Sequence, residues 1–165
     1  MFAVFAYGSN MFTRKMKDPA PSARAREIAR LPGYRLRFNK VSDDGSGKGN
    51  IVATGNAGDE TWGVIFEIAD EHRAALDKSE GGYMSVPIDV LTEEGSRSVL
   101  TYIARPDRVD NSLRPYTWYK EFVVRGAEQH GLPPEYINKL KIVEAIADPD
   151  EARERKNRAL LATAC

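Results

Sequence analysis

The sequence predicts an α+β domain in which a small, mainly antiparallel β-sheet precedes a group of segregated helices. Segments with strand periodicity occupy the chain up to Pro106, whereas helical periodicity dominates beyond Pro115. Apolar residues make up 42% of the 165 residues, which is enough for a substantial core. A chain of 165 residues is typical of a single domain, which we expect over residues 1–148, followed by a charged helical tail over residues 149–165.

Composition and charge exclude several classes of protein. The 24 basic residues balance the 24 acidic ones, so we expect no nucleic acid and no membrane as partner. The one cysteine, Cys165, rules out an intramolecular disulfide, and the distant His72 and His130 do not make up a zinc ligand set. No apolar stretch has the length of a membrane span and no signal sequence is found, so we expect a cytoplasmic protein. The oligomeric state stays open, a homodimer included.

The strand predictions are based on runs of strand-forming residues and on alternation between apolar and polar positions. The predicted strands cover residues 1–7, 34–38, 51–55, 61–68, 83–91 and 98–103. Gly63, inside one of them, marks a closely packed position. Residues 24–31 alternate only weakly and fit either a strand or a helix.

Five helices are expected from their periodicity and end signals. Residues 10–17 form a short helix capped by Asn10, and residues 71–79 form one capped by Asp70 and ended by Gly81-Gly82. Beyond Pro115, one helix has a continuous apolar face made of Tyr119, Phe122, Val123, Gly126 and Ala127. Gly131 ends that helix, Pro133-Pro134 starts the next, and residues 151–165 form the charged tail helix.

A glycine-rich segment at residues 42–50 contains Gly45-Ser46-Gly47-Lys48, which is similar to the end of a phosphate-binding loop. The pattern fails because Ser42 stands where the first glycine belongs and Gly49 stands where a serine or threonine would bind magnesium. A predicted strand, not a helix, follows the segment. We therefore interpret it as a flexible loop between strands.

The predicted N-terminal strand ends in a loop that can bind a ligand. Its apolar run stops at Tyr7 and is followed by Gly8-Ser9-Asn10. Gly8 lets the backbone approach a ligand closely, and outward-pointing N–H groups can hold an anion or a carbonyl oxygen. An ordinary turn after a strand is the alternative interpretation.

Glu80 is the candidate catalytic residue. It follows the predicted helix over residues 71–79, where the negative end of the helix dipole and partial burial would both raise its pKa. Such a carboxyl group can take up and return a proton near neutral pH. An exposed glutamate at the end of a helix is the competing interpretation.

Three spaced motifs resemble those of the γ-glutamylcyclotransferase (AIG2-like) family and occur in the family's order. They are Phe5-Ala6-Tyr7-Gly8-Ser9-Asn10, then Leu76-Asp77-Lys78-Ser79-Glu80-Gly81, and finally Tyr119-Lys120-Glu121 with Arg125-Gly126-Ala127-Glu128 and Leu132-Pro133-Pro134-Glu135-Tyr136. The resemblance covers about residues 2–145. It implies a small sheet curled toward a barrel, with helices packed at its side.

The resemblance also implies a reaction and a site. Members of the family convert γ-glutamyl amides to 5-oxoproline and a free amine, because the substrate's own α-amino group attacks its γ-carbonyl. No metal, cofactor or enzyme nucleophile is required, and Glu80 would act as general acid and base. The residues expected to bind the substrate are Val4, Phe5, Ala6, Tyr7, Gly8, Ser9, Asn10, Tyr119 and, as a weaker candidate, Tyr83. Tyr119 fits a place in the core equally well.

Several alternatives stay open. Only Gly81 and Gly82 separate Glu80 from Tyr83, fewer residues than in the family, which leaves the substrate in question. Related branches act on γ-glutamylamines, on glutathione or on a carrier-bound acyl chain, whereas the loop here looks most like that of the γ-glutamyl amino acid branch. A non-catalytic binding domain of the same fold and an interaction module built on the late helices are the competing functions. A serine hydrolase is disfavoured because Ser9 lacks the Gly-x-Ser-x-Gly turn.

Overall fold

The computed structural model describes residues 1–162 of the chain. This part of the chain has seven β-strands, five α-helices and three short 3-10 helices. Cys165 and the end of the predicted tail helix lie outside the described residues. Within residues 1–162, no helix has both the length and the apolar character needed to cross a bilayer.

Five strands close into a barrel in the order β1, β5, β2, β6 and β7. Their bounds are, in that order, Phe2–Ala6, Glu60–Ile68, Arg24–Pro32, Tyr83–Thr92 and Gly95–Ala104. Neighbouring strands run antiparallel except at the closure, where β1 lies parallel to β7 with Val4 opposite Leu100. Strands β3 (Tyr34–Val41) and β4 (Gly47–Ala53) form a separate antiparallel pair. The expected α+β class, with a mainly antiparallel sheet curled into a barrel, is confirmed.

The structure settles two uncertain segments. Residues 24–31 belong to strand β2, and a register shift between Ala25 and Glu27 explains why their alternation is weak. The loop expected at residues 42–50 is shorter than predicted, because β4 already begins at Gly47. Its turn is fixed by Asp44, whose carboxylate accepts hydrogen bonds from Ser46 N and Ser46 Oγ at 2.9 and 2.6 Å. A strand follows this segment, so it is not a phosphate-binding loop.

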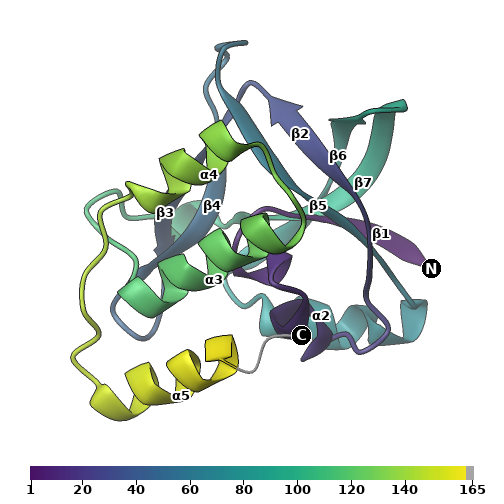
Figure 1. Cartoon of the computed structure of the whole chain (residues 1–165). Coiled ribbons are helices and arrows are strands. Elements are labelled where there is room, and N and C mark those ends of the chain that lie inside the picture. Colours follow the sequence, from purple (N-terminus) through teal and green to yellow (C-terminus); the bar gives the residue numbers. More distant parts are fainter. Residues whose placement is uncertain (163–165) are drawn as a thin grey trace.

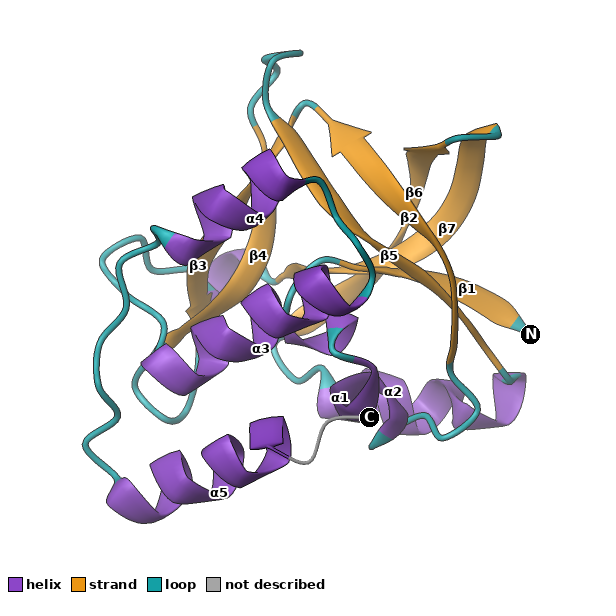
Figure 2. Ribbon diagram, viewed as in Figure 1, coloured by secondary structure: helices purple, strands orange, loops and turns teal. Residues whose placement is uncertain are grey.

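The longer helices pack beside the barrel, on the side away from β6 and β7 (Figures 1 and 2). The longer ones are α3 (Thr117–Gln129), α4 (Pro134–Lys141) and α5 (Glu151–Ala162). The short ones are η1 (Ser9–Met11) and α1 (Thr13–Lys17) after β1, η2 (Asp70–His72) and α2 (Arg73–Ser79) after β5, and η3 (Pro106–Arg108) after β7.

The two predicted helix caps are wrong. Phe12 precedes α1 and Ala69 precedes η2, and neither helix has a side-chain cap bond. Asp70 instead accepts a hydrogen bond from the terminal ammonium group of Met1 at 2.9 Å, and Asn10 donates one to a residue of the cavity described below. Both side chains therefore bond to groups that are distant in the sequence, which local capping rules do not consider.

Helix α3 buries the apolar face that its periodicity predicts, namely Tyr119, Phe122, Val123, Gly126 and Ala127. At Gly126 the helix approaches the segment after β1 so closely that a Cβ atom would lie 2.5 Å from the backbone nitrogen of Phe12. Gly131, with a φ of +71°, follows the end of the helix as predicted. The contact at Gly126 fixes the loop after β1 against α3.

The C-terminal helix α5 is docked on α3. Asp148, just before it, accepts hydrogen bonds from Arg153 Nε and Nη2, both at 2.6 Å, and from Trp118 Nε1 at 2.8 Å. Arg153 holds the pKa of Asp148 well below its usual range. Leu161, near the other end of α5, is buried. Both ends of the helix are therefore attached to the domain.

Candidate functional site

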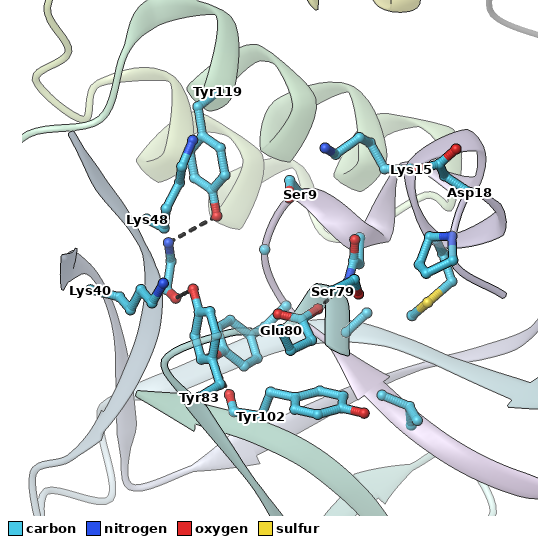
Figure 3. A pocket seen from close by; sticks show the side chains of 18 of the residues that line it. Ser9, Lys15, Asp18, Lys40, Lys48, Ser79, Glu80, Tyr83, Tyr102 and Tyr119 are labelled. Atoms are coloured by element: carbon cyan, nitrogen blue, oxygen red, sulfur yellow. Dashed lines mark hydrogen bonds between the residues drawn. The ribbon is translucent and has the colours of Figure 1, made fainter. Parts of the chain in front are cut away.

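A cavity of about 310 Å³ lies between the loop after β1, the start of α3 and the turn after α2 (Figure 3). All the residues assigned to the site from the sequence line it: Val4, Phe5, Ala6, Tyr7, Gly8, Ser9, Asn10, Glu80, Tyr83 and Tyr119. They come from four elements and from three distant parts of the chain. The fold therefore brings the predicted site residues together around one space.

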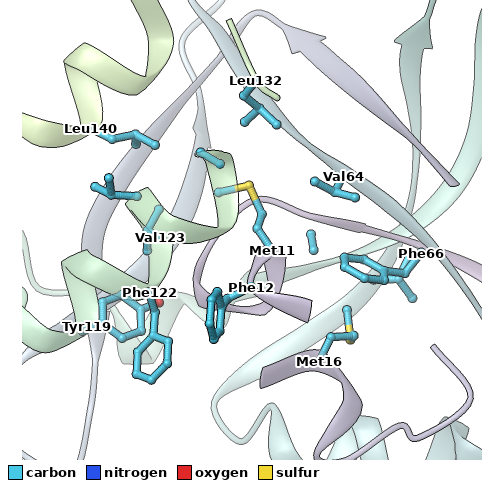
Figure 4. Packing of buried hydrophobic residues seen from close by; sticks show 14 of the residues in the cluster. Met11, Phe12, Met16, Val64, Phe66, Tyr119, Phe122, Val123, Leu132 and Leu140 are labelled. Carbon is cyan, nitrogen blue, oxygen red and sulfur yellow. The ribbon is translucent and has the colours of Figure 1, made fainter. Parts of the chain in front are cut away.

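The loop after β1 is held in place by the core. Met11 and Phe12, which follow it directly, are buried in the same cluster as Phe122 and Val123 of α3 (Figure 4). The rings of Phe12 and Phe122 lie 5.6 Å apart in a tilted arrangement. Because a close-packed core resists displacement, the cavity wall formed by Gly8, Ser9 and Asn10 is pre-positioned.

Glu80 is partly buried at the end of α2. Asn10 Nδ2 donates a hydrogen bond to Glu80 Oε1 at 2.6 Å, so the loop orients the carboxyl group directly. Burial raises the pKa of Glu80 from 4.5 to about 7, whereas the Asn10 bond and the charges of Lys40 and Lys15 oppose the rise. The carboxyl group therefore changes its protonation state near neutral pH, with burial as the main cause.

Tyr119 and Tyr83 meet at the backbone of Gly49 in β4. Gly49 N donates a hydrogen bond to Tyr119 Oη at 2.9 Å, and Tyr83 Oη donates one to Gly49 O at 2.6 Å. Burial raises the pKa of both hydroxyls, that of Tyr119 to about 12, so both are neutral at neutral pH. Tyr119 thus belongs to the buried face of α3 and to the cavity wall at once. Gly49 was missed from the sequence because it was placed in a flexible loop.

Tyr7 connects β1 to the neighbouring elements of the site. Its hydroxyl donates to the backbone oxygen of Tyr102 in β7, and Tyr102 Oη donates to Asp77 Oδ1 in α2 at 2.6 Å. Tyr102 also lines the cavity. These bonds tie the end of β1 to β7 and to the helix that ends at Glu80.

Three lysines that the sequence analysis did not identify also line the cavity: Lys15, Lys40 and Lys48. Lys48 Nζ lies 3.1 Å from Asp44 Oδ2 and above the rings of Trp118 and Tyr119. Burial lowers the pKa of all three ammonium groups. No local signal distinguishes a lysine that faces a cavity from a solvated one, so only the fold reveals them.

The cavity combines a carboxyl group that titrates near neutral pH, neutral hydroxyls, backbone N–H groups and several cations. Such a set can transfer a proton and bind an anionic ligand. Within residues 1–162, no group of three or more His, Cys, Asp or Glu side chains is placed to hold a metal ion.

Comparison with known proteins confirms the family resemblance. The model of the AIG2-like family matches residues 60–140. A bovine (Bos taurus) γ-glutamylcyclotransferase is 34% identical over 153 residues, and a human (Homo sapiens) one is 33% identical over 151 residues. Each alignment covers 87% of this chain and 79% of the relative. A solved structure of a γ-glutamyl cyclotransferase is 30% identical with a TM-score of 0.80, covering 94% of this chain and 98% of its own.

The similarity extends over sequence and fold alike. The chain belongs to the γ-glutamylcyclotransferase family and is an enzyme of this kind.

Proposed function

We propose that the protein converts a γ-glutamyl amino acid to 5-oxoproline and the free amino acid, with Glu80 as general acid and base. The observation that carries the proposal is the position of Glu80: its carboxyl group lies in the cavity, is oriented by Asn10 and has a pKa of about 7. A group with that pKa is suited to take up and return a proton at neutral pH.

The reaction moves two protons from the α-nitrogen of the substrate to the departing nitrogen. The substrate's α-ammonium group loses a proton to Glu80, and the resulting amine attacks the γ-carbonyl carbon to form the new C–N bond of the ring. The bond between the γ-carbon and the departing nitrogen then breaks as that nitrogen receives the proton from Glu80. The ring nitrogen also gives up its second proton, which Glu80 passes to the departing amine, so that the products are a neutral lactam and an ammonium group. No water is consumed, and Glu80 returns to its initial ionised state.

The attack places negative charge on the γ-carbonyl oxygen. Tyr119 is a candidate donor to this oxygen, because its Oη accepts the hydrogen bond from Gly49 N and its own hydrogen is available for donation. The backbone N–H groups of the loop at residues 8–10 are candidates for the same role and for binding the glutamyl α-carboxylate. Donors of this kind typically contribute about 3 to 4 kcal/mol to transition-state stabilisation.

Release of 5-oxoproline from a panel of γ-glutamyl amino acids, γ-glutamylamines and glutathione tests the proposal. The wild type is compared with Glu80→Gln, and Glu71→Gln serves as matched control because Glu71 is exposed on η2 and does not line the cavity. We expect release by the wild type and the control and its loss in Glu80→Gln. Substrate binding that survives in Glu80→Gln without turnover assigns the chemistry, and not merely the affinity, to this carboxyl group. Full turnover by Glu80→Gln would refute the assignment.

A further inference from the structure

Lys40 presents a charged group to the cavity from the end of β3. The residue is only 7% exposed, and its Nζ lies 4.9 Å from the centre of the Tyr83 ring. In Figure 3 its ammonium group lies to the left of Glu80, and that of Lys15 lies above Glu80. The side chain thus occupies a defined place in the cavity wall.

The other cations near Lys40 have carboxylate partners of their own. Lys48 Nζ lies 3.1 Å from Asp44 Oδ2, and Arg108 Nη2 lies 3.3 Å from Asp43 Oδ1. Among the described residues, no carboxylate lies within 4.0 Å of Lys40 Nζ. Glu80 and Lys40 interact through space, but they form no ion pair within 4.0 Å, and the carboxyl group of Glu80 is hydrogen-bonded to Asn10. This end of the cavity therefore carries one ammonium group without an ion pair.

The turn after Glu80 makes room for this ammonium group. Gly82 has a φ of +86°, and a Cβ atom at this position would lie 2.8 Å from Lys40 Cε and 3.0 Å from Lys40 Nζ. A side chain at residue 82 would displace Lys40 from its position. The position of Lys40 therefore requires a glycine at residue 82 in the short turn after Glu80.

Two ammonium groups without ion pairs fit a substrate with two separated carboxylates. Lys15, on α1 directly after the η1 loop, also has no carboxylate within 4.0 Å among residues 1–162. The proposed function already assigns the glutamyl α-carboxylate to the loop that precedes α1, on the Lys15 side. With the glutamyl part bound there, Lys40 is the cation left for a carboxylate on the departing part of the substrate.

We propose that Lys40 is a specificity-determining residue that binds the carboxylate of the departing amino acid. The inference depends on the proposed function and deepens it, because it assigns the preference for a carboxylate on the departing amine to one residue; γ-glutamylamines without that carboxylate should be poor substrates. A desolvated ammonium–carboxylate contact discriminates strongly against a neutral analogue, because that analogue leaves the buried charge without a partner.

A matched pair of substrates tests the inference on the whole chain. γ-Glutamyl-alanine and γ-glutamyl-alaninamide differ only in replacement of the carboxylate by a neutral carboxamide. We expect the wild type to prefer the first in kcat/KM by about 10- to 100-fold, the range for a hydrogen bond to a charged group. In Lys40→Met, which keeps the apolar stem, the ratio of the two kcat/KM values should fall close to one, and Lys40→Arg should restore much of it.

Lys78→Met is the matched control, because Lys78 is exposed on α2 and does not line the cavity. It removes one positive charge near Glu80 and should leave the substrate ratio unchanged. Equal kcat/KM values for the two substrates in the wild type would overturn the inference while the proposed function stands, and this result needs no variant to fold. An unchanged ratio of the two kcat/KM values in folded Lys40→Met would also overturn the inference. The same holds if Lys15→Met, and not Lys40→Met, loses the preference for the carboxylate substrate. No 5-oxoproline from either substrate would refute the proposed function and the inference with it.

Discussion

Replacing Glu80 with glutamine preserves the shape of the side chain and removes its ability to exchange a proton. The acceptor oxygen that receives the Asn10 hydrogen bond is kept, so the geometry of the loop should be retained. If Glu80 is the general acid and base, kcat should fall by about 10²- to 10⁴-fold, the usual contribution of a positioned proton-transfer group.

The same substitution has an effect on stability that follows from the burial of Glu80. In the unfolded chain the carboxyl group ionises near 4.5, whereas in the folded protein its pKa is about 7. The unfolded state therefore releases its proton first, and the folded state loses stability as the pH rises from about 4.5 to about 7. At about 1.36 kcal/mol per pKa unit, this loss reaches about 3 kcal/mol above pH 7.

Glu80→Gln has no carboxyl group to ionise, so it should not lose this stability. Relative to the wild type, it should gain up to about 3 kcal/mol in free energy of unfolding between pH 4.5 and pH 8. Urea denaturation at both pH values, monitored by circular dichroism, measures the difference, and Glu71→Gln serves as the exposed control. A difference between Glu80→Gln and wild type that does not change with pH would refute the raised pKa. A kcat within about fivefold of the wild type would refute the role in proton transfer.

Three further predictions concern the surroundings of the site. Asn10→Ala removes the hydrogen bond that opposes the pKa rise of Glu80, so the acid limb of the pH profile of kcat/KM should move to higher pH. The expected shift is about one pH unit for a bond worth about 1.4 kcal/mol. An acid limb that does not move would contradict the effect of Asn10 on the pKa of Glu80. Gly126→Ala places a methyl group 2.5 Å from the backbone nitrogen of Phe12. Although alanine has the better helix propensity, this clash should lower the free energy of unfolding by about 1 to 3 kcal/mol, which urea denaturation measures. Arg153→Leu leaves the buried Asp148 carboxylate without its cation and should lower Tm by several degrees at pH 7, whereas no change would mean that α5 contributes little to stability.

The sequence predicts the parts of this fold that depend on local pattern. The strand before Tyr7 follows from a continuous run of apolar strand-forming residues. The buried face of α3 follows from periodicity, because burial on one side of a helix repeats at a fixed interval. The weak alternation of residues 24–31 is also local in origin, since the bulge near Ala25 moves the following residues to the other face of the strand. The closure of the barrel between β1 and β7 joins strands far apart in the chain, and only the family resemblance indicated it.

The site was predictable only where a motif carries it. Glu80 and the loop after β1 were identified through the family motifs, and the structure places both in one cavity. The motif assigns Asn10 to the site, but local rules predict a helix cap for its side chain, because its partner Glu80 lies 70 residues away and such rules consider only neighbours. Lys40 was missed for a similar reason. Its burial and its lack of an ion pair depend on the packing of β3 against the turn at Gly82, which the sequence does not show.

The pH dependence of kcat/KM for 5-oxoproline release from γ-glutamyl-alanine tests the central claim most directly. In this parameter the acid limb reports the free enzyme's catalytic base. Because burial raises the pKa of Glu80, activity should rise with pH through an apparent pKa of about 7. An acid limb near the ordinary value of 4.5, or the same limb persisting in Glu80→Gln, would contradict the assignment of proton transfer to this carboxyl group.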